Sequence, residues 1–227
     1  MFDVGLQKRF LKAVAELTGN VEAAGINVTD EDTDAEVRHW LNGADDPLDW
    51  AGAGVIADEW FFVTTLYGTM TLDGQRTHIR KFFPLFVTEA GRDIRRFAPA
   101  LLADWRLRQP WMKTRLCRMA EVLNEKGETM EEYASSLREI ECHATPEQPM
   151  PALARILQDH RAGEGKTLSV FVRDCVKGNC FPIDSRVAKQ LEVYGLPKNE
   201  RLLVSLCLGE QLNPRRTARA FYQADGA

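Results

Sequence analysis

A lysine and an aspartate stand 18 residues apart in the stretch of the sequence that is best suited to covalent chemistry, residues 163–189. Lys166 sits in a Gly-flanked turn at a helix start, and Asp184 sits in Phe-Pro-Ile-Asp-Ser-Arg-Val, where the next helix begins. A helix that begins at Lys166, followed by a short turn and a segment that runs back, would bring both side chains to the same end of a helical hairpin. An amine and a carboxylate that face each other across a cleft can act on an electrophilic carbon.

Two other interpretations of these residues have to be weighed. Asp184 stands where a helix N-cap belongs, so a purely structural cap is an alternative role. Gly165-Lys166-Thr167 has the ending of a phosphate-binding P-loop, but that motif needs a glycine at position 160 and a preceding strand. Position 160 is histidine and the approach is helical, so the P-loop interpretation fails.

The elements that must position the pair are helices, because apolar residues recur at helical spacing and no alternating strand pattern occurs. The segment from Ala57 to Met70 is apolar nearly all round, which predicts a central buried helix capped near Asp58. Thr129 and Glu132 form a capping-box pattern. We therefore predict an all-α protein with about ten helices. The expected helices span residues 3–18, 57–70, 75–86, 93–103, 112–126, 130–140, 151–160, 167–176, 185–194, 200–208 and 214–223, with a further short helix before residue 41.

The charge of the chain is unevenly distributed along its length. The overall charge is −4, yet residues 1–60 carry four Lys/Arg against thirteen Asp/Glu, so the remainder is positive. Residues 106–118 hold five basic residues and no acidic one. A basic cleft on an acidic protein suits a polyanionic ligand, whereas ordinary solvated helix faces are the alternative explanation.

The five cysteines are scattered without a Cys-x-x-Cys pair, and the four histidines lack metal-like spacing, so we predict no metal site and no cofactor. No apolar run approaches the ~20 residues of a membrane helix, and the N-terminus lacks a secretory pattern. We expect a cytoplasmic protein, associated with the nucleoid if the source is prokaryotic, with no membrane partner. A monomer is the default expectation.

Two blocks of sequence resemble the helix-hairpin-helix DNA glycosylase superfamily, which includes endonuclease III and the archaeal 8-oxoguanine DNA glycosylases. The first, Glu59-Trp-Phe-Phe-Val-Thr-Thr-Leu-Tyr-Gly-Thr-Met-Thr-Leu-Asp73, is similar to the family's central helix and the turn that probes the duplex. The second combines Gly163-Glu-Gly-Lys-Thr-Leu with Pro182-Ile-Asp-Ser-Arg-Val-Ala, and looks closest to the archaeal branch. The resemblance covers residues 57–194. The cysteine-rich C-terminal loop of endonuclease III is absent.

The resemblance implies a two-lobed fold with a cleft that receives a base flipped out of double-stranded DNA. Residues 1–55 plus 181–227 would form a terminal helical lobe, and residues 56–180 a helical-barrel lobe with the hairpin and Lys166. The implied activity is that of a DNA glycosylase and AP lyase that removes an oxidised purine, 8-oxoguanine above all. Lys166 would attack C1′ in its neutral form, which burial in the cleft would favour, and Asp184 would stabilise the positively charged sugar.

Further residues receive roles from the same resemblance. Met70 would act as a wedge in the duplex, and Val170 and Phe171 would line the base pocket, with core packing as the alternative for all three. The hairpin glycines differ from the family pattern, because Glu164 lies between them and its charge is unfavourable near a phosphate. The residues predicted to contact DNA are Gly163, Gly165, Thr167, Ser185, Arg186, Lys177, Lys189 and Met70.

Two functions of other classes remain open from the sequence. Glu164 in the hairpin and Met70 at the wedge position are also compatible with a DNA-binding module that lacks catalysis. The acidic first 60 residues are compatible with a helical interaction domain unrelated to DNA.

Overall fold

The computed structural model describes residues 3–26, 55–66, 72–107, 109–162 and 165–224, and these contain only helices, turns and loops. Ten α-helices occur in this described part, together with a 3₁₀ turn, η1 (Ile94–Arg96), and a π-helical turn, η2 (Val172–Val176). The prediction of an all-α protein with about ten helices is confirmed for these residues. The helices are α1 (Val4–Ala23), α3 (Ile56–Leu66), α4 (Leu72–Thr88), α5 (Pro110–Lys126), α6 (Met130–Glu141), α7 (Pro151–Asp159), α8 (Lys166–Phe171), α9 (Ser185–Val193), α10 (Glu200–Gly209) and α11 (Pro214–Gln223).

Side-chain caps set several of the helix boundaries. The capping box predicted at the start of α6 is present, because Thr129 Oγ1 accepts from the Glu132 N–H while the Glu132 carboxylate accepts from the Thr129 N–H. Gly127 ends α5 with φ of 68°, a left-handed conformation that favours glycine. Local capping chemistry therefore made these boundaries predictable.

Three local predictions differ from the structure. The helix expected over residues 93–103 is only the turn η1, because Asp93 caps a single turn and Pro99 disfavours helical backbone at the residue before it. Asp58 does not cap α3; it lies inside the first turn and is fully buried. α1 continues past Gly19 to Ala23, since Val21 extends its buried stripe. The short helix expected before residue 41 lies outside the described residues.

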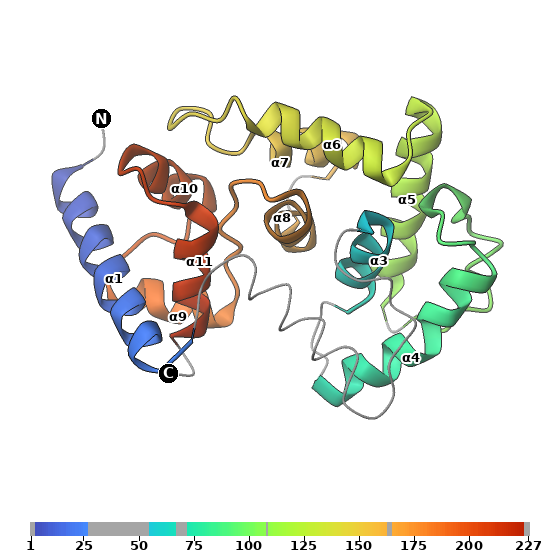
Figure 1. Cartoon of the computed structure of the whole chain (residues 1–227), viewed down its shortest axis with the longest axis horizontal. Coiled ribbons are helices and arrows are strands. Elements are labelled where there is room, and N and C mark those ends of the chain that lie inside the picture. The colour runs from blue at the N-terminus through green and yellow to red at the C-terminus, as the bar shows by residue number, and fades with distance from the viewer. Residues whose placement is uncertain (1–2, 27–54, 67–71, 108, 163–164, 225–227) are drawn as a thin grey trace.

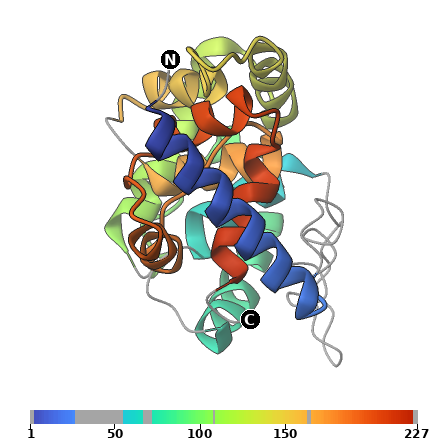
Figure 2. The same ribbon diagram turned by 90° about the vertical axis from the view of Figure 1, so that its left-hand side faces the viewer.

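The buried apolar side chains of the described residues form two clusters. The larger one surrounds α3, which packs against α4, α5, α6 and α8, and it includes Phe61 stacked on Phe86 with ring centroids 4.7 Å apart. α3 is therefore the central buried helix that its composition predicted. The smaller cluster joins α1 to α9, α10 and α11, and Figure 2 shows α1 lying across the face of this group.

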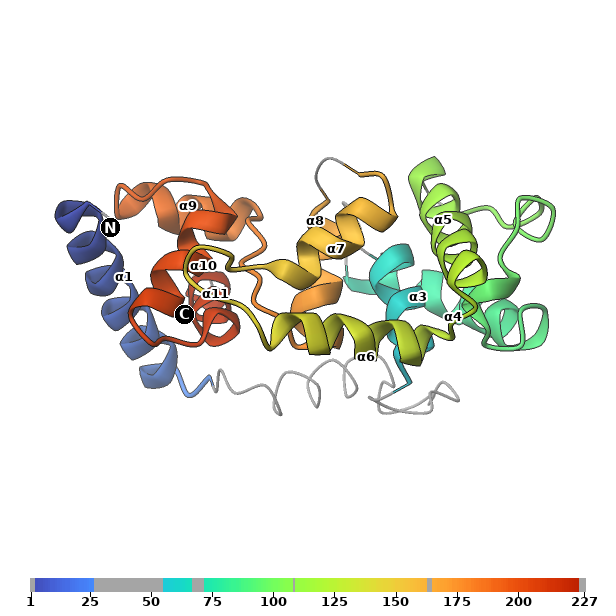
Figure 3. The same cartoon turned by 90° about the horizontal axis from the view of Figure 1, so that it is seen from above.

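The two clusters lie side by side, and the chain passes between them just before α9. Cys180 belongs to the larger cluster and Phe181 to the smaller one. Figures 1 and 3 show α7 and α8 standing between the group of α1, α9, α10 and α11 and the group of α3, α4 and α5. The division into folding units at residues 55 and 180 stays a prediction. No helix in the described segments is both long and apolar enough to cross a bilayer.

Candidate functional site

Lys166 is the first residue of α8, directly after the N-cap Gly165. Its side chain is 50 % exposed, so the burial that we expected for the amine is not present. The helix itself is short, since α8 passes into the π-helical turn η2 after Phe171. Lys166 therefore stands at the surface on a rigidly packed base, because Leu168 and Ser169 behind it are buried.

Asp184 is the N-cap of α9, and its two carboxylate oxygens have separate tasks. Oδ1 accepts a hydrogen bond of 2.8 Å from the Val187 N–H, which is the capping contact. Oδ2 lies 3.9 Å from the Lys166 Nζ. The cap and the pairing with lysine, which were alternatives in the sequence, are therefore compatible in one side chain.

A partly buried glutamate that sequence reasoning missed holds this pair in position. The Glu200 carboxylate of α10 accepts from the Ser169 hydroxyl of α8 and, over 2.7 Å, from the Phe181 N–H. Burial raises the pKa of Glu200, and the hydrogen bond from Ser169 opposes that rise. One side chain thus ties α8 and the segment before Asp184 to α10.

A second partly buried glutamate supports the same segment from the other side. Glu141, at the end of α6, accepts from the Asn179 N–H over 2.7 Å and from the Ala152 N–H over 3.0 Å. Glu141 and Glu200 together fix both ends of the stretch between residues 179 and 181. The sequence did not mark Glu141 as a supporting residue, because a glutamate at a helix end is ordinary in any helical protein.

The residues predicted to contact DNA fall into three groups. Ser185, Arg186 and Lys189 are exposed on the first turns of α9, beside Asp184, and Lys177 is exposed after η2. Gly165 caps α8, whereas Thr167 is buried and has no surface to offer a duplex. Gly163 and Met70 lie outside the described residues.

The Arg186 guanidinium lies 4.9 Å from the centroid of the Tyr222 ring, which orients it along α11. It remains exposed at the start of α9 in that position. A phosphate contact from Arg186 stays a prediction.

Val170 and Phe171 are packed in the core rather than along a pocket. Their exposed fractions are 2 % and 0 %, and Phe171 meets Trp60 edge to face with ring centroids 4.8 Å apart. Of the two roles weighed for these residues, the structure places them in core packing, because they face inward from α8 toward α3. Any pocket for a base would have to draw its walls from other residues.

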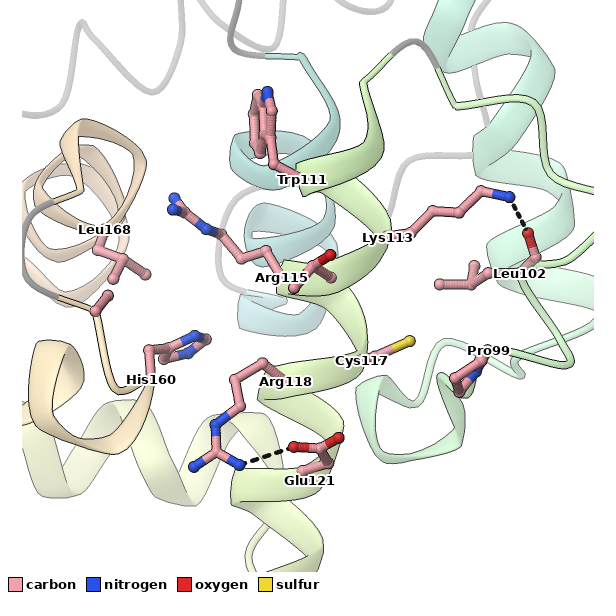
Figure 4. Close-up of a pocket in the computed structure, with 12 residues that line it drawn as sticks. Pro99, Leu102, Trp111, Lys113, Arg115, Cys117, Arg118, Glu121, His160 and Leu168 are labelled. Atoms are coloured by element: carbon pink, nitrogen blue, oxygen red, sulfur yellow. Dashed lines mark hydrogen bonds and ion pairs between the residues drawn. The ribbon is translucent and has the colours of Figure 1, made fainter.

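A cavity of about 640 Å³ lies across the outer face of α5, between the loop at residues 99–102 and the α7–α8 region (Figure 4). Three basic side chains line it, and they come from the run of basic residues that the sequence had marked as a possible basic cleft. Among the described residues, no group of three metal-binding side chains forms a metal site. The lining residues are Pro99, Leu102, Trp111, Lys113, Thr114, Arg115, Cys117, Arg118, Glu121, His160, Ala162 and Leu168.

Comparison with known proteins gives no assignment. No family model, no curated protein and no solved structure matches the chain.

Proposed function

We propose that this protein is a DNA glycosylase with AP-lyase activity, which removes an oxidised purine, 8-oxoguanine above all, through a Schiff base on Lys166. The main observation that supports the proposal is the Lys166–Asp184 pair. The Lys166 amine and a free carboxylate oxygen of Asp184 are 3.9 Å apart, at the ends of two different helices. The resemblance of the flanking sequence to the helix-hairpin-helix glycosylases supports the same conclusion and the same two-lobed fold.

In the proposed reaction the neutral Lys166 amine attacks C1′ of the damaged nucleotide. The bond from C1′ to the base breaks, and the base leaves with the bonding electrons and takes up a proton. Positive charge develops on the sugar as this bond breaks, and the Asp184 carboxylate is close enough to stabilise it. Ring opening then gives an imine between Lys166 and C1′. Loss of a proton from C2′ expels the 3′ phosphate by β-elimination, and water releases the lysine.

The accessibility of Lys166 fits a substrate that arrives from outside. An amine that is half exposed can be reached by an everted nucleotide without movement of the core. The exposed basic side chains of Arg186 and Lys189 lie on the first turns of α9, within five residues of Asp184, where a DNA backbone could approach. Double-stranded DNA with a damaged base is accordingly the proposed partner.

A borohydride-trapping assay tests the proposal. The full chain is incubated with duplexes that carry 8-oxoguanine, other oxidised bases, deaminated bases or alkylated bases, and borohydride is added to reduce any imine. We expect a covalent protein–DNA adduct with the 8-oxoguanine duplex and strand cleavage without borohydride. Absence of both an adduct and cleavage across the whole panel would contradict the proposed activity.

A second candidate function is DNA binding without catalysis. It is favoured by one observation, namely that Lys166 is half exposed, so the burial expected for the amine from the resemblance is not present. Binding that falls with salt but is equal for intact and abasic duplexes, together with no adduct, would favour this module over the enzyme.

A further inference from the structure

The cavity on α5 contains a cation that has no ion-pair partner among the described residues. The Arg115 Nη1 atom is buried and has no hydrogen-bond partner among the described residues. Its guanidinium lies 5.5 Å from the centroid of the Trp111 ring, which covers one face of it. Burial lowers the pKa of Arg115, and no carboxylate of the described residues acts against that effect. A partly buried guanidinium without an anion is costly, so the cavity is suited to receive one.

The other two basic residues of the cavity are already engaged. Lys113 Nζ donates to the backbone carbonyls of Leu102 and Ala103. Arg118 donates to the Asp159 carbonyl over 2.7 Å and pairs with Glu121 over 2.7 Å. Arg115 is therefore the member of this basic group that makes no hydrogen bond or ion pair with the described residues.

The wall opposite Arg115 carries a second polar atom without a hydrogen-bond partner in the described part of the chain. This atom is His160 Nε2, which is buried. Burial, with the charges of Arg115 and Arg118, lowers the pKa of His160 to about 4, so the ring is neutral at neutral pH. Figure 4 shows the His160 ring and the Arg115 guanidinium reaching from opposite sides toward the same space. A neutral imidazole can donate to an anion without adding a further charge.

The position of this space relates it to Lys166. A Cβ atom built on Gly165 would lie 3.6 Å from Arg115 Nη2, so the guanidinium is adjacent to the N-cap of α8. Leu168, on the next turn of the same helix, lines the cavity. An anion bound at Arg115 would therefore lie close to the helix start that carries the lysine.

We propose that Arg115 binds a backbone phosphate of the DNA strand whose damaged nucleotide reaches Lys166, with His160 as a second hydrogen-bonding group. This inference rests on the proposed function for the identity of the strand. A phosphate matches the site because it is a compact anion that accepts two hydrogen bonds from one guanidinium. The adjoining apolar walls from Trp111, Ala162 and Leu168 then face the attached sugar.

The test measures binding separately from chemistry. Wild-type protein, Arg115→Gln and the matched control Arg9→Gln, an exposed arginine of α1, are titrated with a duplex containing a non-cleavable abasic analogue. We expect Arg115→Gln to bind about tenfold more weakly, and its slope of log affinity against log salt to be smaller by about 1. Arg9→Gln should match the wild type. Equal affinity and slope for Arg115→Gln and wild type would overturn the proposal.

A phosphate scan locates the contact. Each phosphate near the analogue is replaced in turn by a neutral methylphosphonate. We expect one position at which this replacement weakens the wild type about tenfold and leaves Arg115→Gln unaffected. If every replacement weakens both proteins equally, Arg115 contacts no phosphate and the proposal is wrong.

Stability provides a control against simple misfolding. Arg115→Gln removes an uncompensated charge, so its unfolding midpoint without DNA should equal or exceed that of wild type. If this variant does not fold, Arg115→Lys, which keeps the charge but loses the paired donors, is used in the same scan, and unchanged phosphate sensitivity would overturn the proposal. Loss of the trapped adduct in wild type, with the Arg115-dependent phosphate contact retained, would remove the enzyme proposal and leave this binding site.

Discussion

The Lys166–Asp184 pair and the α5 cavity are both cationic regions, and they treat their charge in opposite ways. Lys166 is half exposed and faces a carboxylate at 3.9 Å, so its charge is balanced without a ligand. Arg115 is covered by Trp111, and its Nη1 atom has no partner in the described part of the chain. The first arrangement is stable by itself, whereas the second gains an electrostatic partner only when an anion binds.

This difference separates chemistry from binding. A lysine that is accessible and paired with a carboxylate is suited to react with a substrate and then to return to its resting state. An arginine that is partly buried and has no ion-pair partner among the described residues contributes to affinity and reduces stability until an anion binds. Variants of the two regions should consequently give different combinations of rate, affinity and stability.

The largest effect should come from removal of the amine. We expect Lys166→Gln to lower adduct formation by at least about 10³-fold, because the variant lacks the amine that forms the imine, while the affinity for an abasic-analogue duplex changes little. Quantitative borohydride trapping and titration measure the two properties. The matched control is Lys198→Gln, since Lys198 is 47 % exposed and pairs with Glu192 in the same manner. Trapping retained in Lys166→Gln would contradict the assignment of the nucleophile.

The next effect separates the two tasks of Asp184. Asparagine is a good N-cap, so Asp184→Asn should keep the contact with the Val187 N–H and lose only the charge. We expect base release to slow by about 10²-fold with little change in the free energy of unfolding. Asp184→Ala should slow base release equally and also lose about 1 kcal/mol of stability. Single-turnover kinetics measure base release, and urea titration measures the free energy of unfolding. If Asp184→Asn releases the base as fast as wild type, Asp184 has only its capping role.

Glu200 tests how far the pair depends on its support. Glu200→Ala leaves the buried Phe181 N–H and Ser169 hydroxyl without an acceptor, so we expect a loss of about 2 kcal/mol in the free energy of unfolding. The trapping rate should fall because Lys166 and Asp184 lose their shared anchor, while the Arg115 contact with phosphate should persist. Glu192→Ala, at an exposed position of α9, is the control. If Glu200→Ala weakens the trapping rate and the Arg115 contact with phosphate equally, the Lys166–Asp184 pair and the α5 cavity are not independent.

His160 gives the pH dependence of the cavity. Its pKa is lowered from 6.5 to about 4, so between these values the unfolded chain binds a proton that the folded chain does not. Stability should therefore fall as the pH is lowered from 6.5 to about 4, by about 2 kcal/mol from this group. Asp58, whose pKa burial raises to about 6, acts in the opposite direction between 3.8 and about 6.

His160 and Asp58 have opposite effects on stability as the pH falls. The contribution of His160 is therefore measured by comparing wild type with a His160 variant. The free energies of unfolding of wild type and His160→Gln are measured by urea titration from pH 4 to pH 7. The difference between the two proteins should change by about 2 kcal/mol between pH 7 and pH 4, because only the wild type loses the His160 contribution. Parallel pH profiles for the two proteins would show that His160 is not buried in its neutral form.

The sequence predicted what depends on local chemistry. Capping patterns placed the start of α6 at Thr129 and the start of α9 at Asp184, because a side chain that accepts from a nearby N–H acts within one helical turn. Apolar composition all round α3 predicted its central position, since a helix without a polar face must be covered on every side. The separation of Lys166 and Asp184 followed from one helix and one return, which is also a short-range property.

What the sequence did not reveal depends on packing between distant segments. Glu200 lies 31 residues from its partner Ser169, and nothing in its local pattern marks it as a residue that contacts two other segments. Val170 and Phe171 follow Lys166 closely, yet the rotation of α8 turns them toward α3 and away from the lysine. Arg115 was visible only as one member of a basic run, because its lack of an acidic partner is a property of the three-dimensional neighbourhood.

The central claim is that one amine, that of Lys166, becomes covalently attached to the sugar of a damaged nucleotide. The most direct measurement is mass spectrometry of the protein after trapping with an 8-oxoguanine duplex, nuclease digestion and proteolysis. We expect the reduced sugar fragment on Lys166, and the modified lysine should resist cleavage by trypsin. A fragment on any other lysine or on the N-terminal amine, or no modified peptide at all, would contradict it.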